Sequence, residues 1–258
     1  MRALRPACHA PAALLALVSL SGAPLAAAAP EEIQVYVDDL TTPGRFGLDV
    51  HNNYASSARD TPDYEGEQPP EHVYRLTPEF YYGLSSELEL GLYLLSTRSA
   101  AGEAHFDGEK LRLKFVAPHD TQHGMFWGLN VELGRTSERV SEYPWNLEVK
   151  GILGYRQSRW LLAANLNVDR SLARTGVATL ELDTKLAYDV GHEIQLGTEL
   201  YDELGPATHP GPLNEFSQAA YAIVDTEVHG LEINAGLGWG LTSAADQWVL
   251  KLIVGHRF

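Results

Sequence analysis

Residues 125–134 read Met-Phe-Trp-Gly-Leu-Asn-Val-Glu-Leu-Gly. The odd positions of this stretch are all apolar, whereas the even positions after Phe126 are glycine, Asn130, Glu132 and a second glycine. Successive side chains of a β-strand point to opposite faces, so this period of two predicts a strand with one apolar and one polar face.

The same alternation recurs along the chain and predicts twelve strands. Most are longer than the strands of soluble sheets and have the length of a tilted strand that crosses a bilayer. The predicted ranges are 44–54, 72–82, 87–96, 109–117, 124–135, 145–155, 160–169, 177–190, 193–202, 215–224, 231–241 and 248–258.

The predicted connections alternate between long and short, as in an outer-membrane barrel with long outer loops and tight periplasmic turns. The similar lengths of 118–123 and 242–247 make this alternation imperfect. Strand directions assigned from the loops place the apolar-face aromatic residues near the two ends of the strands, where a barrel meets the lipid interfaces. These residues are Phe80, Tyr82, Trp127, Tyr155, Trp160, Tyr188 and Phe258 at the periplasmic end, and Tyr54, Tyr74, Trp145, Trp239 and Trp248 at the outer end.

The polar face carries many ionised side chains. Their number distinguishes a membrane barrel, which is surrounded by lipid, from a soluble barrel, which is surrounded by water. A soluble barrel or sandwich would bury the apolar face, whereas a barrel in lipid turns that face outward and its charges toward the lumen. We therefore predict an all-β, transmembrane, antiparallel up-and-down barrel. The candidate lumen-lining residues are Arg75, Glu79, Glu87, Glu89, Lys110, Arg112, Lys114, Glu132, Glu148, Lys150, Glu181, Asp183, Lys185 and Glu199.

The chain begins with the pattern of a secretory signal peptide, predicted at residues 1–29. Arg2 and Arg5 precede an apolar stretch from Ala12 to Leu20, and small residues follow at 26–29. A membrane anchor is the alternative, but the apolar stretch is shorter than a spanning helix needs. The only cysteine, Cys8, lies in this segment, so no disulfide scaffold is expected.

The composition of the chain limits its partners. The formal net charge is −15, and the acidic balance argues against nucleic-acid binding. The acidic loop 55–71 would attract cations or bridge divalent ions to lipopolysaccharide, but a solvated acidic loop is the simpler interpretation.

Residues 30–43 precede the barrel domain at 44–258. Ile33, Val35 and Val37 alternate before Asp38 and Asp39 interrupt the pattern. This segment is either periplasmic, as a short extra strand, or tucked into the lumen, where it would narrow any pore.

The last strand ends in Phe258, behind apolar residues of the same parity at Trp248, Leu250 and Leu252. It resembles the signal that the barrel-assembly machinery reads in Gram-negative outer-membrane proteins. Runs such as 76–84, 87–94, 110–115 and 236–242 further resemble poorly characterised proteobacterial outer-membrane barrels, labelled putative transporters or "meta-pathway of phenol degradation" proteins. The resemblance implies a fold and an outer-membrane location, with lipid and lipopolysaccharide as surroundings, more than a substrate.

No catalytic, cofactor or metal motif is evident, and we expect no enzyme. His119 and His123 share one turn and could bind a metal, although a solvated turn is the simpler interpretation. The preferred function is a porin-like channel or transporter for small solutes, and the resemblance implies hydrophobic or aromatic ones. A structural or surface-interaction barrel with a closed lumen is the alternative, followed by a lipid-modifying barrel enzyme.

Overall fold

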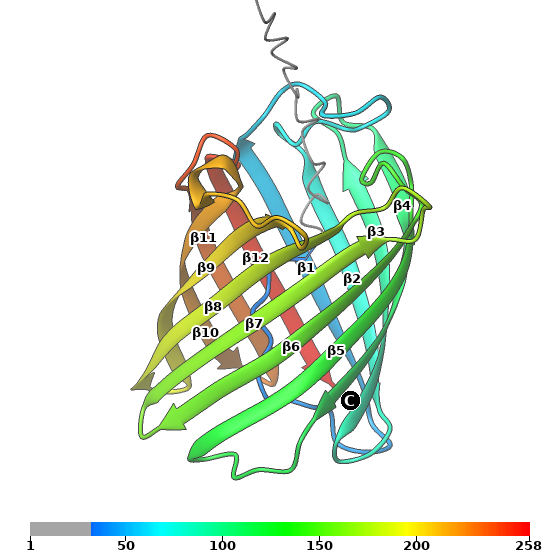
Figure 1. Cartoon of the computed structure of the whole chain (residues 1–258). Helices are drawn as coiled ribbons and strands as arrows, with labels where there is room; N and C mark the ends of the chain where they lie inside the picture. Colours follow the sequence, from blue (N-terminus) through cyan, green and yellow to red (C-terminus); the bar gives the residue numbers. More distant parts are fainter. Residues whose placement is uncertain (1–31) are drawn as a thin grey trace, which may run out of the picture.

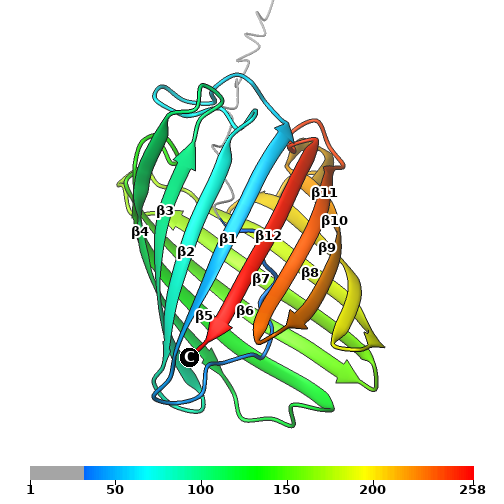
Figure 2. The ribbon, with the colours of Figure 1, turned by 180° about the vertical axis from the view of Figure 1, so that it is seen from behind.

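The computed structural model describes residues 32–258, and the predicted signal peptide at 1–29 lies outside them. Every strand is antiparallel to its neighbours, and β12 pairs with β1 to close the sheet into a barrel (Figures 1 and 2). This confirms the predicted twelve-stranded up-and-down barrel. The strands are β1 Phe46–Ser57, β2 Tyr74–Gly83, β3 Leu88–Arg98, β4 Ala104–Val116, β5 Gly124–Thr136, β6 Trp145–Gln157, β7 Trp160–Ser171, β8 Ala178–Gly191, β9 Ile194–Pro206, β10 Gln218–Val228, β11 Leu231–Gly240 and β12 Trp248–Arg257.

The two ends of the barrel differ in their connections. One end, here called the turn end, carries the tight β6–β7, β8–β9 and β10–β11 hairpins. The β6–β7 hairpin, for example, has only residues 158–159 between its strands. The other, the loop end, carries the long connections such as 58–73 and 207–217. Both ends of the barrel sequence lie at the turn end, where the Phe258 amide donates to the Phe46 carbonyl at 2.8 Å.

The alternation of the sequence becomes an alternation of the two barrel faces. On β5, Leu129 is 42% exposed on the outer face, whereas Asn130 is fully buried on the inner face. The outer face is built of leucine, valine and aromatic side chains, and the inner face carries most of the buried charges. An apolar exterior around an ionised interior is the arrangement of a barrel that crosses lipid.

Exposed aromatic residues gather near both ends of the outer face. Trp127 and Trp160 lie toward the turn end, and Trp145, Trp239 and Trp248 lie toward the loop end. Amphipathic rings at two levels are expected where a barrel meets two lipid interfaces.

Several strands extend beyond their predicted ranges at the loop end. β4 begins at Ala104 rather than at 109, and β9 continues to Pro206 rather than 202. The β3–β4 register shifts between Leu95 and Ser96, opposite Gly108, whose φ is +139°. This bulge breaks the period of two, so the alternation ends before the strand does.

Helix is nearly absent from the described part of the chain. A single 3₁₀ turn, Leu213–Glu215, precedes β10. In residues 32–258 no helix has the length and apolar character needed to cross a membrane.

Candidate functional site: a lumen that contains the N-terminal segment

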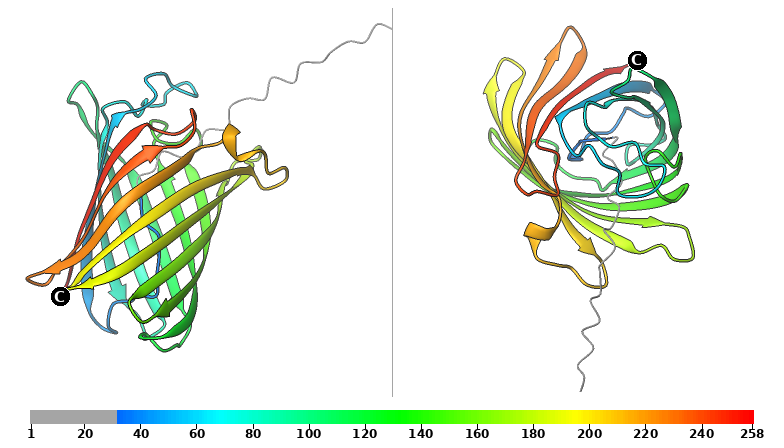
Figure 3. Two further views of the ribbon diagram at one scale, coloured as in Figure 1. Left: turned by 90° about the vertical axis from the view of Figure 1, so that its left-hand side faces the viewer. Right: turned by 90° about the horizontal axis from the view of Figure 1, so that it is seen from above.

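Residues 32–43 run inside the barrel before β1 begins. Viewed from above the loop end, this blue segment lies within the ring of strands (Figure 3). Ile33 contacts the loop-end half of the wall, and Thr41 and Thr42 reach the turn end, so the segment descends along the lumen. The described part of the segment, residues 32–43, therefore lies in the lumen.

The middle of the segment is clamped by β7. Asn165 accepts a hydrogen bond from the Tyr36 amide at 2.6 Å and donates one to the Tyr36 carbonyl at 3.0 Å. This pairing satisfies the buried backbone groups of Tyr36, as a neighbouring strand would. The Tyr36 hydroxyl lies 2.5 Å from the hydroxyl of Tyr93 on β3, so Tyr36 bridges two sides of the wall.

Lower in the lumen, Asp38 joins the segment to the turn end. It binds Arg156 at the end of β6, and its Oδ2 lies 2.9 Å from Nε2 of His119 in the β4–β5 turn. Burial alone would raise the pKa of Asp38, but the bonds to Arg156 and His119 lower it overall. Burial likewise would lower the pKa of His119, yet the Ala117 carbonyl and Asp38 raise it. We call Asp38, His119 and Arg156 the latch.

Asp39 forms the second charged attachment. Lys114 donates to both its side chain and its carbonyl, at 2.9 and 2.8 Å, and Arg257 lies 3.3 Å from its other carboxylate oxygen. Burial opposes ionisation, but the charges of Lys114 and Arg257 hold the pKa of Asp39 well below its usual range.

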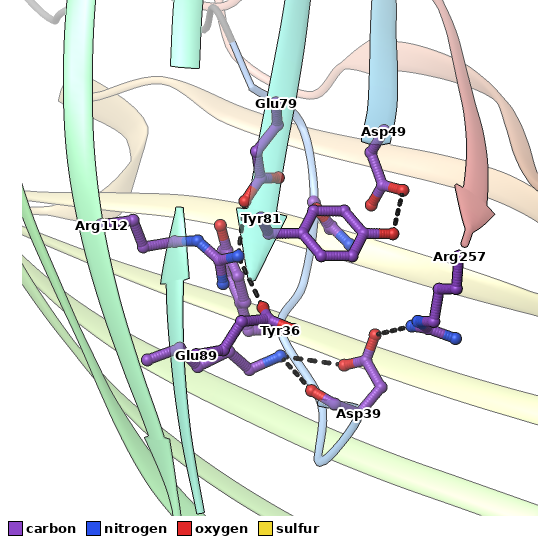
Figure 4. Close-up of a pocket in the computed structure, with 10 residues that line it drawn as sticks. Tyr36, Asp39, Asp49, Glu79, Tyr81, Glu89, Arg112 and Arg257 are labelled. Carbon is purple, nitrogen blue, oxygen red and sulfur yellow. Dashed lines mark hydrogen bonds and ion pairs between the residues drawn. The ribbon is translucent and has the colours of Figure 1, made fainter. Parts of the chain in front are cut away.

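Wall charges continue this network around a cavity of about 20 Å³, the size of one water molecule (Figure 4). Arg112 on β4 lies 2.6 Å from Glu79 on β2 and 2.7 Å from Glu89 on β3. Glu89 also accepts the Thr41 amide at 2.7 Å, which ties the network to the N-terminal segment. Arg112 thus joins two carboxylates, one on the neighbouring strand β3 and one on β2 beyond it.

Two apolar clusters hold the segment against opposite parts of the barrel wall. Val35 and Tyr36 pack with Phe126 and other buried side chains of β5–β8. Ile33 packs with Tyr221 and its neighbours on β1, β10 and β12. The alternating apolar residues of the segment therefore face different strands of one lumen.

Glycines in the wall make room for this packing. A Cβ on Gly83 would lie 2.4 Å from the Thr41 carbonyl oxygen, so glycine is needed where the segment crosses the end of β2. Gly238 lies beneath the ring of Tyr221, and a Cβ there would lie 2.3 Å from it. Gly236 likewise makes room for the Lys251 side chain, which a Cβ would approach to 2.9 Å.

Above the segment, the lumen widens into a cavity of about 530 Å³ at the loop end, here called the vestibule. Its lining combines strand residues with loop residues such as Asp63, Tyr64 and Asp246, and its floor includes Glu32, Ile33 and Gln34. Carboxylates outnumber basic side chains in this lining by ten to four.

The predicted lumen residues fall into three groups and one exception. The turn-end network contains Glu79, Glu89, Arg112 and Lys114; the vestibule contains Arg75, Lys110, Glu148, Lys150, Glu181 and Asp183; and buried ion pairs beside it contain Glu132, Lys185 and Glu199. Glu87 lies in the turn before β3, where Ser85 and Ser86 donate to it.

One group of described side chains has metal-ligand character. Donor atoms of Glu32, His51 and Glu79 lie within 4.8 Å of one another. Tyr36 already donates to Glu32 at 2.6 Å, and Arg112 already pairs with Glu79. Glu32 therefore already accepts a hydrogen bond from the protein, and Glu79 already pairs with a positive charge.

Sequence reasoning overlooked most residues that hold the segment. Asn165, Arg156 and His119 make its contacts, and Lys251 donates to the Ile33 carbonyl at 3.1 Å. Asn165 and Lys251 share the polar face of their strands with many other polar residues, so nothing in the sequence singles them out.

Comparisons with known proteins support the fold. No family model and no curated protein matches the chain. Among solved structures it is similar to the COG4313 outer membrane channel from Pseudomonas putida F1, with a TM-score of 0.59 and 13% identity over 88% of this chain and 100% of the other. It is also similar to the KdgM porin in complex with disordered oligogalacturonate, with a TM-score of 0.57 and 8% identity over 82% and 99% of the two chains. For the NanC porin the TM-score is 0.52, with 9% identity over 81% and 97%.

Proposed function

We propose that this protein is an outer-membrane channel for small solutes, and that residues 32–43 narrow its lumen. The observation that carries the proposal is the vestibule, a cavity of about 530 Å³ at the loop end with a polar floor formed by the N-terminal segment. A barrel built only to fill itself has no need of such a cavity. The fold, shared with channels and porins, is consistent with this function.

The attachment of the segment suits a movable constriction. Ion pairs at Asp38 and Asp39 hold its lower half, and hydrogen bonds and the two apolar clusters hold its upper half. Within residues 32–43 its backbone pairs with the wall as a strand at no point other than the Pro43–Gly83 bridge. Ion pairs and single hydrogen bonds are each worth only about 0.5–3 kcal/mol. Displacement of the segment by voltage would widen the lumen.

The ionised wall favours polar or charged solutes over hydrophobic ones. Membership in the phenol meta-pathway type of barrel, outer-membrane lipid and lipopolysaccharide as surroundings, and Phe258 as the assembly signal remain predictions of the sequence. With the loop end outside the cell, both ends of the barrel sequence would face the periplasm.

Conductance in planar bilayers tests the proposal. The mature protein should give discrete current steps, and release of the segment should enlarge them. The competing function, a structural barrel with a closed lumen, is favoured by the charged network at the turn end. It predicts no current from either form, and that result would reject the channel.

A further inference from the structure

The vestibule wall built by β7, β8 and β9 is its most acidic part. Glu181 lies opposite Glu203 in the β8–β9 register and opposite Asn167 in the β7–β8 register. Asp183 follows on the same face of β8, and all four side chains line the vestibule. Like charges at neighbouring register positions destabilise a sheet, so their concentration here is not explained by stability.

Buried oxygens of this wall lack partners. Asp183 is only 2% exposed; its Oδ2 accepts from Asn167 at 2.7 Å, but its Oδ1 has no hydrogen-bond partner. The Oδ1 atom of Asn167, in a residue 4% exposed, is also without a partner. Buried acceptors normally find a donor or an ordered water, so two buried acceptors without a protein donor, in side chains that line the vestibule, call for a donor or a positive charge from the cavity side.

The four basic residues of the lining are too few to neutralise its ten carboxylates. Arg59 is held by Asp63 and Glu67 at 3.0 and 2.8 Å, in the loop before β2. Lys150 lies 3.0 Å from Glu148, and its ammonium lies 4.6 Å from the centre of the Tyr36 ring below the vestibule. The remaining excess of carboxylates creates a negative potential, which a narrow cavity with low-dielectric walls would focus.

The carboxylates are also spread rather than convergent. Among residues 32–258, the histidine and carboxylate side chains compact enough to ligate one metal ion are Glu32, His51 and Glu79, outside this wall. A series of separated carboxylates suits successive weak contacts with a passing cation better than chelation of one metal ion. Apolar and aromatic neighbours such as Leu180, Val177 and Tyr201 share the lining and would contact the carbon chain of an organic cation.

From this geometry we infer that the vestibule selects small cations, including aliphatic amines, and that Glu181 and Asp183 determine this selectivity. The inference rests on the proposed channel function and specifies its solute class. Negative charge along a confined path raises the local cation concentration and excludes anions.

The experiment is the reversal potential across a planar bilayer in a KCl gradient. The protein should favour K⁺ over Cl⁻ by on the order of tenfold. Glu181→Gln with Asp183→Asn should lower that ratio several-fold, whereas the charge-matched control Asp202→Asn with Glu227→Gln, outside the vestibule lining, should leave it unchanged. Putrescine added on the loop side of the unmodified protein should reduce the K⁺ current, and the uncharged butanediol should not.

Each outcome separates the two proposals. Current without preference for K⁺, or with preference for Cl⁻, would overturn the inference and leave the channel intact. An unchanged ratio in the double variant would remove the assigned role of Glu181 and Asp183. A complete lack of current, with the segment held or released, would overturn the proposed channel and the inference with it.

Discussion

His119 Nε2 lies 2.9 Å from Asp38 Oδ2, which joins the β4–β5 turn to the segment inside the barrel. The same carboxylate binds Arg156 from β6, so one aspartate connects two separate parts of the turn end. Asp38→Ala should leave Arg156 and His119 without their shared partner and increase channel opening. Asp120→Ala, an exposed aspartate in the same turn, is the matched control and should not alter single-channel records.

The latch should depend on pH in both directions. The raised pKa of His119 stabilises the latch at low pH, and this contribution is lost as pH rises above about 6.5 through the folded pKa. The lowered pKa of Asp38 stabilises it at high pH, and that contribution is lost as pH falls below about 3.8 through its folded pKa. Attachment should therefore be strongest between these limits, and opening should increase from pH 5 to pH 8.

His119→Gln tests this assignment, because glutamine keeps a donor but does not titrate. The increase in opening between pH 5 and pH 8 should disappear in this variant and persist in His123→Gln, on the same turn. An equally steep pH response after His119→Gln would assign it to another group.

Asn165→Ala should loosen the segment without opening the barrel. The substitution removes two hydrogen bonds from the Tyr36 backbone, at a cost of about 1–3 kcal/mol for buried groups left unpaired. Hydrogen exchange at Tyr36 and its neighbours should accelerate, while exchange in β7 stays slow. Uniform acceleration over the whole barrel would instead show that Asn165 stabilises the wall.

Gly83→Ala should displace the segment at the turn end, because the new methyl group would meet two carbonyl oxygens of Thr41 and Thr42 at 2.4 and 2.5 Å. Gly151→Ala is the control: its Cβ would have one neighbour, the Leu166 carbonyl oxygen at 3.9 Å. Protease sensitivity of residues 32–43 should rise in the first variant alone. Equal sensitivity in both would contradict the close approach.

Leu129→Arg tests the outward direction of the apolar face. Near the bilayer midplane, a lipid-facing arginine costs about 2–4 kcal/mol in a β-barrel. The free energy of unfolding measured by refolding into lipid vesicles should fall by that amount. A change near zero would place Leu129 away from the hydrocarbon.

The repeating part of the fold was predictable from the sequence, because every strand meets the same two environments. Leu129 and Asn130 show this directly, since the odd or even position of each residue is enough to predict whether its side chain faces outward or into the lumen. The same parity places Lys110 and Arg112 toward the lumen, where the structure has them. Strand ends were less predictable, as at Ala104, because the bulge opposite Gly108 breaks the period of two.

The contacts of residues 32–43 could not be read from a pattern. Asp38 meets Arg156 across 118 positions, and Tyr36 meets Asn165 across 129. Which wall residues become partners depends on the path of this one segment through the lumen. A periodic sequence pattern contains no information about that path. His119 accordingly looked like a solvated turn residue.

Reversible fixation of the segment tests the central claim most directly. Cys8 is the only cysteine and lies in the predicted signal peptide, so Val35→Cys with Ala163→Cys, whose side chains share one buried cluster, would introduce the only thiols of the mature chain. The claim predicts small, steady currents from the oxidised protein and larger currents from the same molecules after reduction. Currents of equal size before and after reduction, with the disulfide verified, would contradict it.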